Sequence, residues 1–484
     1  MNQGVLKFLH HDKMVEIDFT RAPLLPSTTV LNFLRTNPQF RGTKEGCAEG
    51  DCGACTVVIG ELDSSKMIRY YSVDSCLMFL PALHGKRLIT VENLAKRKNG
   101  SLQLHPVQQA IVANHGSQCG FCTPGYAMSM FAFYKNRINP TRETLIDAFS
   151  GNLCRCTGYK PLADSIRQCC SQAKADHFDD NLEEIVEKLA RIKQESPSLK
   201  IVANGQTYLL PAGVSEALEL RAGFHTAKVV NGATDTAINQ NKTHRYLPQI
   251  IDLSQVSDLK TITATQEGFL IGSGVSIEQL KEAAKNHFAE MLPILDVFAS
   301  QQIRNVATIG GNIANASPVG DLLPLLMALN ASVVLASVKG QRKVALEGFI
   351  TGYRSTCLQS EELITGIFLP RRYENSLFYC EKVSTRRDVD ISAVSIAVNL
   401  RLNGNGCIIN PVIVFGGMDE RVKRAKAIEN FIEGQQLTLQ TASLAGEMLT
   451  KQFSPISDAR GSKDFRVTIG RNLLVKAFES FGCS

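Results

Sequence analysis

Residues 42–56 read GTKEGCAEGDCGACT and place three cysteines, Cys47, Cys52 and Cys55, on one short loop. A fourth cysteine, Cys76, follows after a further twenty residues. The spacing C-x4-C-x2-C with one distant cysteine is typical of plant-type 2Fe-2S sites. This stretch therefore predicts a small ferredoxin-like β-grasp domain that wraps its loop around an iron–sulfur cluster.

A second cysteine quartet has a different spacing. Cys119 and Cys122 lie in the sequence CGFC, and Cys154 and Cys156 lie in CRC after a gap of thirty-one residues. Two such quartets predict two 2Fe-2S clusters in the first third of the chain, and with them a role in electron transfer.

Structural zinc sites and disulfide frameworks also contain closely spaced cysteines, so both are alternatives to an iron–sulfur site. Four glycines accompany the first three cysteines, at Gly42, Gly46, Gly50 and Gly53. Glycine lets backbone N–H groups approach the bridging sulfides of a cluster, and zinc has no such sulfides. The pattern favours iron–sulfur at both quartets and leaves zinc as the alternative.

The composition indicates a soluble protein of a reducing compartment. Fourteen cysteines in 484 residues are too sparse for a disulfide scaffold, and no export signal opens the chain, so we expect a cytoplasmic location. The longest apolar stretch, Leu322 to Val338, is too short and too interrupted to span a membrane. The net charge of +6 is spread along the chain, so we expect neither a membrane nor a nucleic acid as a partner.

Hydrophobic periodicity predicts two domains before residue 171. For residues 1–90 it predicts a hairpin over Val5–Phe19, a helix that Ser27 caps and Pro38 ends, and strands over Thr56–Ile59 and up to Val73. Residues 91–170 change to a helical period and form a predicted bundle around the second quartet. Its helices are expected to begin at Pro106, at Pro124, after Thr141 and at Lys160.

The rest of the chain is predicted to form a linker and two further domains. Residues 171–199 contain one amphipathic helix, and α/β patterning begins at residue 200. Residues 200–372 and 373–484 form the two domains, and the second is a small cap with a strand over Ser392–Leu402 and a helix over Arg424–Ile432. The fold class is therefore multidomain α+β.

Two segments of the second half could bind a diphosphate. The strand that ends at Val230 runs into a turn of small residues, and the run from Thr308 to Pro318 combines paired glycines with Thr, Asn and Ser. Asp321 could accept a hydrogen bond from a ligand hydroxyl. A Rossmann site is excluded because Gly272–Ile277, GSGVSI, lacks the third glycine, and no P-loop motif occurs.

These motifs together resemble the molybdenum hydroxylases, specifically the iron–sulfur and flavin portion of the xanthine dehydrogenases. The matching segments are GTKEGCAEGDCGACT, QCGFCTPG, GNLCRCTGY, VVNGATD, TIGGNIANASPVGD and VFGGM, in chain order from residue 42 to residue 418. The resemblance spans essentially the whole chain. It implies an FAD-binding domain of the molybdenum-hydroxylase, non-Rossmann type over residues 200–372, with residues 373–484 as its cap.

The resemblance also implies which residues contact FAD. These are Val230, Asn231, Gly232, Ala233, Thr234, Asp235, Thr236, Phe298, Thr308, Ile309, Gly310, Gly311, Asn312, Asp321, Ile364 and Lys382. Without the resemblance, Phe298 would be interpreted as a core residue and Lys382 as a solvated charge. Many relatives have two adjacent glycines in the turn, so Asn231 and Ala233 are expected to narrow the conformational freedom of the turn slightly, without loss of FAD binding. Gln118 is expected to face molybdopterin across a subunit interface, with an ordinary loop amide as the alternative.

The implied function is that of the small, NAD-reducing subunit of a bacterial xanthine dehydrogenase. A separate large subunit would hold molybdopterin and oxidise hypoxanthine and xanthine to urate, so no catalytic residue for purine oxidation is expected here. Electrons would pass through the helical-domain cluster and then the β-grasp cluster to FAD and NAD. We expect a heterotetramer of two small and two large subunits.

Several alternatives stay open. The subunit could serve another molybdenum hydroxylase that acts on an aldehyde or an N-heterocycle, and dioxygen could replace NAD as the acceptor. The chain could also be a non-enzymatic metal-binding assembly protein that binds no flavin. Six further cysteines lack ligand spacing and are expected to be inert buried thiols, namely Cys169, Cys170, Cys357, Cys380, Cys407 and Cys483.

Overall fold

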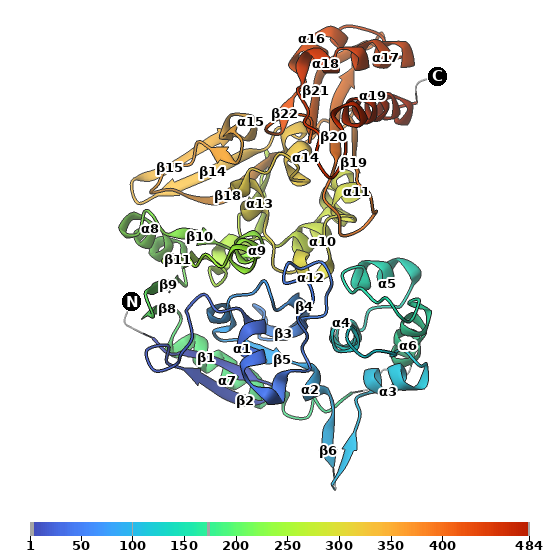
Figure 1. The fold of residues 1–484 in the computed structure, drawn as a ribbon. Coiled ribbons are helices and arrows are strands. Elements are labelled where there is room, and N and C mark those ends of the chain that lie inside the picture. Colours follow the sequence, from blue (N-terminus) through green and yellow to red (C-terminus); the bar gives the residue numbers. More distant parts are fainter. Residues whose placement is uncertain (1–3, 99, 172–174, 483–484) are drawn as a thin grey trace. The chain divides into compact units, whose positions relative to one another are not determined.

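The computed structural model describes residues 4–98, 100–171 and 175–482. It divides into two compact units, each built from helices and strands (Figure 1). Unit 1 contains the residues up to 220, residues 226–255 and residues 299–307, and unit 2 contains residues 221–225, 256–298 and those from 308 onward. The predicted multidomain α+β class is confirmed, and the predicted domain boundaries stay predictions.

A five-stranded mixed sheet forms the N-terminal part of unit 1. Its strands, in spatial order, are β2 (Lys13–Ile17), β1 (Leu6–His10), β5 (Arg87–Ile89), β3 (Thr56–Leu62) and β4 (Ile68–Asp74). Strands β1 and β2 pair antiparallel as the predicted hairpin, and β1 runs parallel to β5. Helix α1 (Val30–Thr36) buries Val30, Leu31 and Leu34 in the core of this sheet.

The predicted cap of α1 is wrong by two residues. Thr29 is the N-cap, and its Oγ accepts a hydrogen bond from the N–H of Asn32 at 3.2 Å. Ser27 instead donates its hydroxyl to Gln206 Oε1 at 3.0 Å, in a fully buried contact. Because the hydroxyl of Ser27 donates to a residue 179 positions away, it does not cap the helix, which begins later than predicted.

The predicted helices around the second quartet are confirmed. They are α3 (Pro106–Ala113), α4 (Thr123–Lys135), α5 (Arg142–Phe149) and α6 (Lys160–Ser171). Helix α4 is the core of this region, because every residue from Gly125 to Tyr134 is buried. The short helix α2 (Val91–Leu94) precedes a hairpin of β6 (Lys96–Lys98) and β7 (Ser101–Gln103), which projects from unit 1 (Figure 1).

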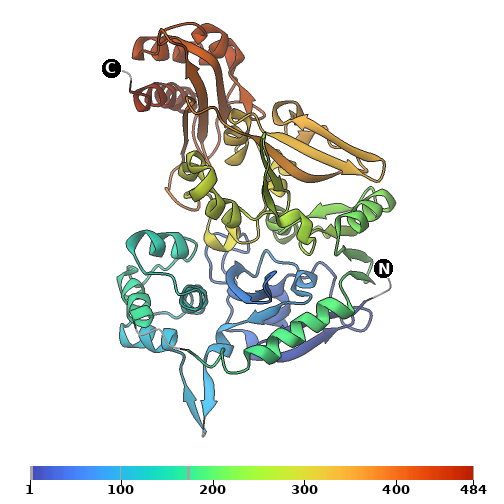
Figure 2. The same ribbon diagram turned by 180° about the vertical axis from the view of Figure 1, so that it is seen from behind.

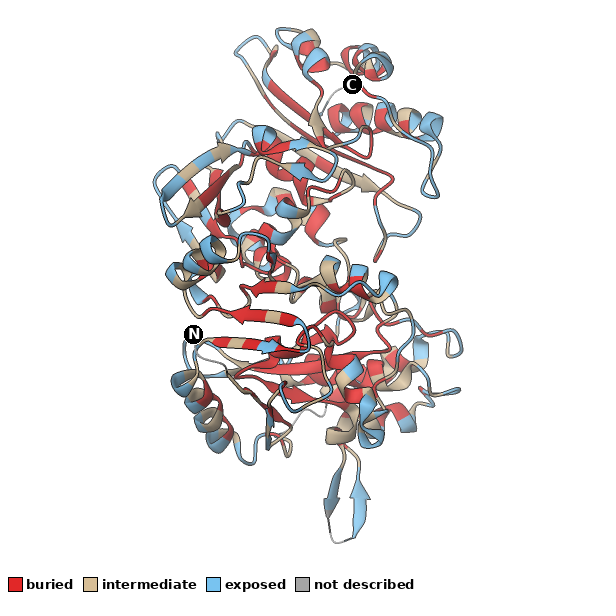
Figure 3. Ribbon diagram, turned by 60° about the vertical axis from the view of Figure 1, so that its left-hand side comes forward, coloured by how far each residue is buried: buried red, intermediate tan, exposed pale blue. Residues whose placement is uncertain are grey.

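The linker helix and a second sheet complete unit 1. Helix α7 (Leu182–Glu195) buries Ile185 and Leu189 against Leu9 of β1, and Figure 2 shows it crossing the face of the first sheet. The second sheet has the order β10 (Lys228–Val230), β11 (Gln249–Asp252), β9 (Gln206–Leu210), β8 (Leu199–Ala203). It shares one buried core with the first sheet, and the buried residues follow the strands (Figure 3). Helices α8 (Val214–Gly223) and α9 (Thr234–Thr243) precede and follow β10.

Unit 2 contains two further large sheets. The first has the order β12 (Ile262–Ala264), β13 (Gly268–Gly272), β18 (Leu363–Pro370), β14 (Ser332–Ser337), β15 (Gly340–Ala345). The second has the order β19 (Leu377–Val383), β20 (Val394–Leu402), β21 (Ile408–Gly416), β22 (Lys423–Arg424). The helices of this unit include α10 (Ile277–His287), α13 (Ile309–Asn315), α14 (Leu322–Ala328), α16 (Lys426–Ile432), α17 (Leu439–Glu447), α18 (Leu449–Gln452) and α19 (Lys463–Ser480).

Unit 2 differs from the predicted start of one helix and divides the longest apolar stretch of the chain. The predicted helix over Arg424–Ile432 begins only at Lys426, because Arg424 belongs to β22 and binds Glu429 through Nε and Nη2 at 3.0 and 2.8 Å. The apolar stretch from Leu322 to Val338 is divided between α14 and β14. In the described part of the chain, no helix has the length and apolar character needed to cross a membrane.

Candidate iron–sulfur centres and flavin-binding segments

The first quartet lies in unit 1 on the loop between α1 and β3 and just after β4. It consists of Cys47, Cys52, Cys55 and Cys76. Cys55 Sγ lies 3.4 Å from Cys76 Sγ, and both residues are buried. The Cys52 thiol is the main cause that lowers the pKa of Cys47 below its ordinary value, so these two sulfurs also lie together. The quartet is thus arranged as two pairs of thiols.

Backbone donors surround the first quartet, as the glycine pattern predicts. The N–H groups of Glu49 and Asp51 donate to Cys47 Sγ at 3.4 and 3.3 Å. A Cβ on Gly46 would come within 2.8 Å of Cys52 Sγ, so a larger residue there would require this sulfur to move. N–H groups directed at sulfur stabilise the anionic charge of an iron–sulfur cluster.

The second quartet lies at helix ends in unit 1. Cys119 and Cys122 precede α4, and Cys154 and Cys156 lie between α5 and α6. Cys122 interacts with Cys154, and burial together with this neighbour raises the pKa of Cys122 to about 12. A backbone hydrogen bond from Phe121 and the contact with Cys156 lower the pKa of Cys119. This quartet therefore also forms two pairs.

The pairing of the thiols is compatible with a two-iron cluster. A structural zinc ion needs four ligands that converge on one point. A 2Fe-2S cluster binds two thiolates at each iron and therefore suits two pairs of cysteines. The residues of both quartets fit the predicted clusters.

Asn152 joins the two cysteine-bearing segments. Its side chain is buried, and its Nδ2 donates to Gly53 O at 3.1 Å and to Thr56 Oγ at 3.2 Å. Its Oδ1 accepts from Ser129 Oγ at 2.7 Å and from Gln302 Nε2 at 2.8 Å. All four hydrogen-bonding positions of the amide are therefore used. Asn152 is a residue that the sequence did not indicate.

A backbone hydrogen bond connects the same two segments directly. The N–H of Leu153 donates to Cys52 O at 3.0 Å. Cys52 belongs to the first quartet, and Leu153 immediately precedes Cys154 of the second. Gly125, in the first turn of α4, makes this approach possible, because a Cβ there would lie 2.1 Å from Gly53 O.

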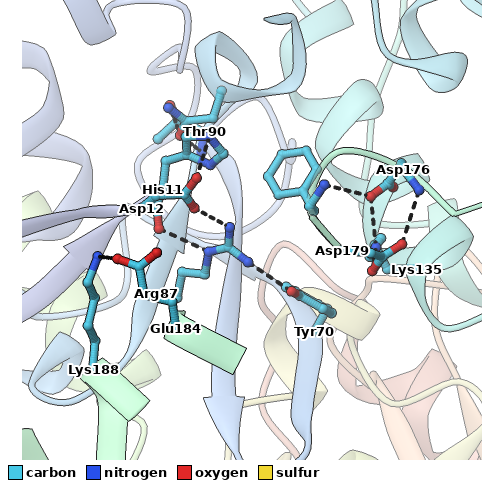
Figure 4. A network of polar contacts seen from close by, with 12 residues as sticks. His11, Asp12, Tyr70, Arg87, Thr90, Lys135, Asp176, Asp179, Glu184 and Lys188 are labelled. Carbon is cyan, nitrogen blue, oxygen red and sulfur yellow. Dashed lines mark hydrogen bonds and ion pairs between the residues drawn. The ribbon is translucent and has the colours of Figure 1, made fainter. Parts of the chain in front are cut away.

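A second polar network fixes the β-grasp sheet, the end of α4 and the linker relative to one another (Figure 4). The buried guanidinium of Arg87 donates to Asp12 Oδ1 at 2.5 Å and to Tyr70 Oη at 2.9 Å. Lys135, at the end of α4, donates to Asp176 Oδ1 at 2.9 Å and to Asp179 Oδ1 at 2.7 Å. Lys135 Nζ also lies 5.6 Å from the centre of the Tyr70 ring, so this ammonium connects the end of α4 with the β-grasp sheet.

The predicted flavin turn of unit 1 follows β10. Gly232 has a φ of +81°, and a Cβ there would lie 1.9 Å from Val306 O, so no other residue fits. Ala233 has a φ of +57°, a left-handed conformation that costs an alanine roughly 1–2 kcal/mol. It is also the N-cap of α9 and provides no side-chain cap, which leaves the first amides of the helix suited to a phosphate. Residues Thr234–Thr236 form the first turn of α9.

The glycine-rich segment of unit 2 differs from its prediction. It was expected to be a loop of free N–H donors, but residues 309–315 form α13, which Thr308 caps. The N–H groups of Ile309, Gly310, Gly311 and Asn312 all donate within the protein, so a contact of this segment with FAD would use other atoms. One buried acceptor in this segment does lack a protein partner, namely Asn312 Oδ1. A ligand hydroxyl or amide would satisfy it.

Asp321 and Lys382, both predicted to contact FAD, bind each other in unit 2. Lys382 Nζ lies 2.7 Å from Asp321 Oδ2 and also donates to the carbonyl oxygens of Val297 and Asp390 at 3.4 and 3.0 Å. Ser392, which the sequence did not indicate, donates to Asp321 Oδ1 at 2.5 Å. The side chain of Lys382 is only 3% exposed, so the interpretation as a solvated charge is wrong.

The remaining predicted site residues are less informative. Ile364 is buried in β18, and Phe298 is half-buried. Gln118 is exposed beside the exposed Cys119, as a residue at an interface would be. In the described residues, Asn312 Oδ1 and the uncapped start of α9 fit FAD, whereas the complete set of FAD contacts stays a prediction.

The other cysteines only partly match their expected burial. Cys169 and Cys380 are buried as predicted. Cys170, Cys357 and Cys407 are partly exposed, so the prediction of buried thiols is wrong for these three. The prediction for Cys483 lies outside the described residues.

Comparison with known protein families matches three consecutive parts of the chain. Residues 90–167 match the model of a [2Fe-2S] binding domain. Residues 201–372 match the FAD binding domain in molybdopterin dehydrogenase. Residues 379–481 match the CO dehydrogenase flavoprotein C-terminal domain. The second half of the chain therefore carries a flavin-binding fold.

Similar proteins include xanthine dehydrogenases. The chain is 32% identical to xanthine dehydrogenase of Drosophila subobscura over 94% of its own length and 38% of the relative's. It is 31% identical to xanthine dehydrogenase/oxidase of Gallus gallus over 97% of its own length and 39% of the relative's. The chain thus spans about two fifths of the length of these relatives.

Solved structures of similar fold cover more than half of the chain. Carbon monoxide dehydrogenase from Hydrogenophaga pseudoflava aligns with a TM-score of 0.55 and 23% identity over 59% of this chain and 100% of that chain. Quinoline 2-oxidoreductase from Pseudomonas putida 86 aligns with a TM-score of 0.52 and 25% identity over 56% of this chain and 95% of that chain. The paired cysteine quartets, the three family matches and the similarity to xanthine dehydrogenases together show that this chain belongs to the molybdenum hydroxylase family, as its iron–sulfur and FAD-binding portion.

Proposed function

We propose that this chain is the electron-transfer and NAD-reducing subunit of a xanthine dehydrogenase. A partner subunit with molybdopterin hydroxylates hypoxanthine and xanthine to urate, and this chain carries the electrons through the second quartet, the first quartet and FAD to NAD. The observation that supports this order most strongly is the contact between the quartets. One hydrogen bond, from Leu153 N–H to Cys52 O, joins the backbone beside Cys154 to a cysteine of the first quartet.

The exposure of the two quartets supports the same direction. Cys119 and Cys156 of the second quartet are exposed, whereas Cys55 and Cys76 of the first are buried. Apolar side chains beside the second quartet are also exposed, with values of 48% for Phe121, 43% for Leu153 and 45% for Tyr159. Exposed apolar groups around a redox centre favour the docking of a protein partner. The large subunit would cover this surface, with Gln118 at its edge, in the proposed heterotetramer.

FAD would supply the two-electron chemistry that NAD requires, because an iron–sulfur cluster transfers single electrons. The proposed contacts are the turn from Val230 to Thr236 in unit 1, and in unit 2 Phe298, Thr308–Asn312, Asp321, Ile364 and Lys382. Asp321 would accept a hydrogen bond from a ligand hydroxyl, and Lys382 and Ser392 would hold its carboxylate in place, since they bind its two oxygens.

Two classes of substrate are candidates for the partner subunit, a purine and another N-heterocycle. The similar proteins of known sequence are xanthine dehydrogenases, which favours a purine. Quinoline 2-oxidoreductase shares the fold of 56% of this chain, so a partner that acts on another N-heterocycle is the second candidate. A non-enzymatic role without flavin is disfavoured, because residues 201–372 match an FAD binding domain.

Cofactor analysis and reduction by NADH test the proposal on this chain alone. The purified protein should contain about four irons and one FAD and show two distinct 2Fe-2S signals by electron paramagnetic resonance. Rapid mixing with NADH should reduce flavin and clusters. Zinc in place of iron would refute the cluster assignment. If NADH did not reduce the flavin, the proposed electron transfer from FAD to NAD would be refuted, and dioxygen would be favoured as the acceptor.

A further inference from the structure

The C-terminal end of α9 holds the loop of the first quartet. Asn241 Nδ2 donates to Ala48 O at 3.0 Å and to Cys76 O at 2.9 Å. One side chain therefore joins the loop that carries Cys47 to the segment that carries the most distant cysteine of the quartet. Both segments belong to unit 1, and the contact connects residues 193 and 165 positions apart in sequence.

The next residue brings a positive charge to the same loop. Lys242 Nζ donates to Cys47 O at 3.2 Å and lies 2.7 Å from Glu49 Oε2. Glu49 in turn donates its backbone N–H to Cys47 Sγ. The ammonium thus bridges the Cys47 carbonyl and the carboxylate of Glu49, and both side chains are partly open to solvent, at 47% and 36% exposure.

These contacts matter because reduction adds an electron to the cluster. A nearby positive charge favours the reduced form, and a nearby negative charge disfavours it. Lys242 and Glu49 carry opposite charges, so each offsets the effect of the other on the cluster as long as both are present. Loss of either one leaves the other uncompensated next to Cys47.

We propose that Asn241 and Lys242 are positioning residues through which α9 holds the first cysteine loop, and that the Lys242–Glu49 pair sets the reduction potential of the first cluster. This inference rests on the proposed function, because it assumes a 2Fe-2S cluster at these cysteines. It goes further by assigning a redox-tuning role to residues outside the cysteine motif.

The placement of α9 adds a second consequence. The helix begins at the proposed flavin turn, at Thr234, and its last turn reaches the cysteine loop. Ten helical residues span about 15 Å, so one rigid element fixes the flavin turn and the loop at a set separation. A change at Asn241 should therefore affect the cluster without a change in the flavin turn itself.

Redox titration of the full chain, followed by electron paramagnetic resonance, tests the charge role. The variants are Lys242→Met, Glu49→Gln and the double variant, with Lys13→Met in the exposed part of β2 as the charge control. At a fixed potential, Lys242→Met should lower the ratio of reduced to oxidised first cluster about threefold, the scale expected for a partly exposed charge. At 59 mV per tenfold change, this is a shift of about 28 mV.

Glu49→Gln should shift the ratio in the opposite direction, and the double variant should return close to the wild-type value. The second cluster provides an internal control and should not move. Added salt should reduce both shifts, because the pair is partly exposed. Equal potentials in all variants, or shifts of the same sign for Lys242→Met and Glu49→Gln, would overturn the charge role. A wild-type chain without 2Fe-2S signals would instead refute the proposed function.

The positioning role of Asn241 has its own readout. Asn241→Ala should alter the line shape of the first-cluster signal and speed the release of its iron to a chelator, while the flavin content stays unchanged. Asn241→Gln, which keeps the amide donor, should restore part of the wild-type behaviour. Asn239→Ala, exposed on the same helix, is the matched control. Identical spectra and iron release for Asn241→Ala and Asn239→Ala would overturn this role.

Discussion

Gly125 is the position at which a single methyl group should separate the two cysteine segments. A Cβ on Gly125 would lie 2.1 Å from Gly53 O and 3.2 Å from Ala54 Cα, and these neighbours are backbone atoms of the first cysteine loop. A contact under 3.0 Å cannot persist, so Gly125→Ala must push α4 and the loop apart by about 1 Å. The hydrogen bonds of Asn152 and Leu153 cross this same interface.

The expected cost follows from packing. Overpacking costs about 1–3 kcal/mol, and the upper end applies because the backbone cannot rotate away as a side chain can. Alanine gains up to about 1 kcal/mol over glycine in a helix, which leaves a net loss of about 2 kcal/mol. For a unit of this size, that loss lowers the unfolding midpoint by about 4–8 °C.

The assay is thermal unfolding of the holo chain, followed by the visible absorption of the clusters, together with the resonance signals of both clusters. Gly213→Ala is the matched control, because no atom of the described structure lies within 4 Å of a Cβ there. The first-cluster signal of Gly125→Ala should broaden, and electrons should pass between the clusters more slowly. An unfolding midpoint within 1 °C of both the wild type and the control, with unchanged signals, would refute the packing argument.

Three further substitutions test other parts of the structure. Gly232→Ala should abolish flavin binding but keep the iron, because its Cβ would collide with Val306 O, and the ratio of flavin to iron in the purified variant measures this. Ala233→Gly should remove the cost of the left-handed alanine and raise thermal stability by about 1 kcal/mol without loss of flavin, and a lower midpoint would contradict it. Burial raises the pKa of Asp176, but hydrogen bonds from His105 and Lys135 outweigh it and hold the pKa at about 2, below the ordinary 3.8. The unfolded chain therefore binds this proton more readily, and the stabilisation is present above pH 4 and is lost as the pH falls from about 4 to about 2. Asp176→Asn should flatten this part of the pH–stability curve, and an unchanged slope would show that the carboxylate does not contribute.

Local signals in the sequence predicted the elements that depend on local physics. The helices at Pro106 and Lys160 form as expected, because a proline in the first helical turn acts within a few residues. The cysteine spacings also predicted the quartets, since the ligands of each loop lie close in sequence. The pairing of thiols within each quartet could not be read from the spacing alone.

Long-range contacts account for most of what the sequence did not show. Serine is a residue type that often caps helices, but the hydroxyl of Ser27 donates to Gln206 instead. No residue near Ser27 in the sequence indicates this contact. Lys382 resembles a solvated charge until the fold buries it against Asp321. The paired glycines at Gly310 and Gly311 suggested a loop, but Gly310 is required for a different reason, because a Cβ there would meet Ser273 at 2.6 Å.

The same reasoning explains why the cysteine motifs alone do not specify an electron route. Each motif determines how a cluster is bound, and the spacing of Cys119 and Cys122 would be the same wherever the second quartet lay. The proposed route depends on contacts outside the motifs: Asn152 and Leu153 bring the two quartets together, and Asn241 and Lys242 join the first quartet to the helix that begins at the proposed flavin turn. These four residues hold backbone carbonyls and not metals, so their effect should appear in potentials and transfer rates while the clusters remain bound. Substitutions that keep the iron and change the flow of electrons would therefore distinguish the residues of the route from those of the binding sites.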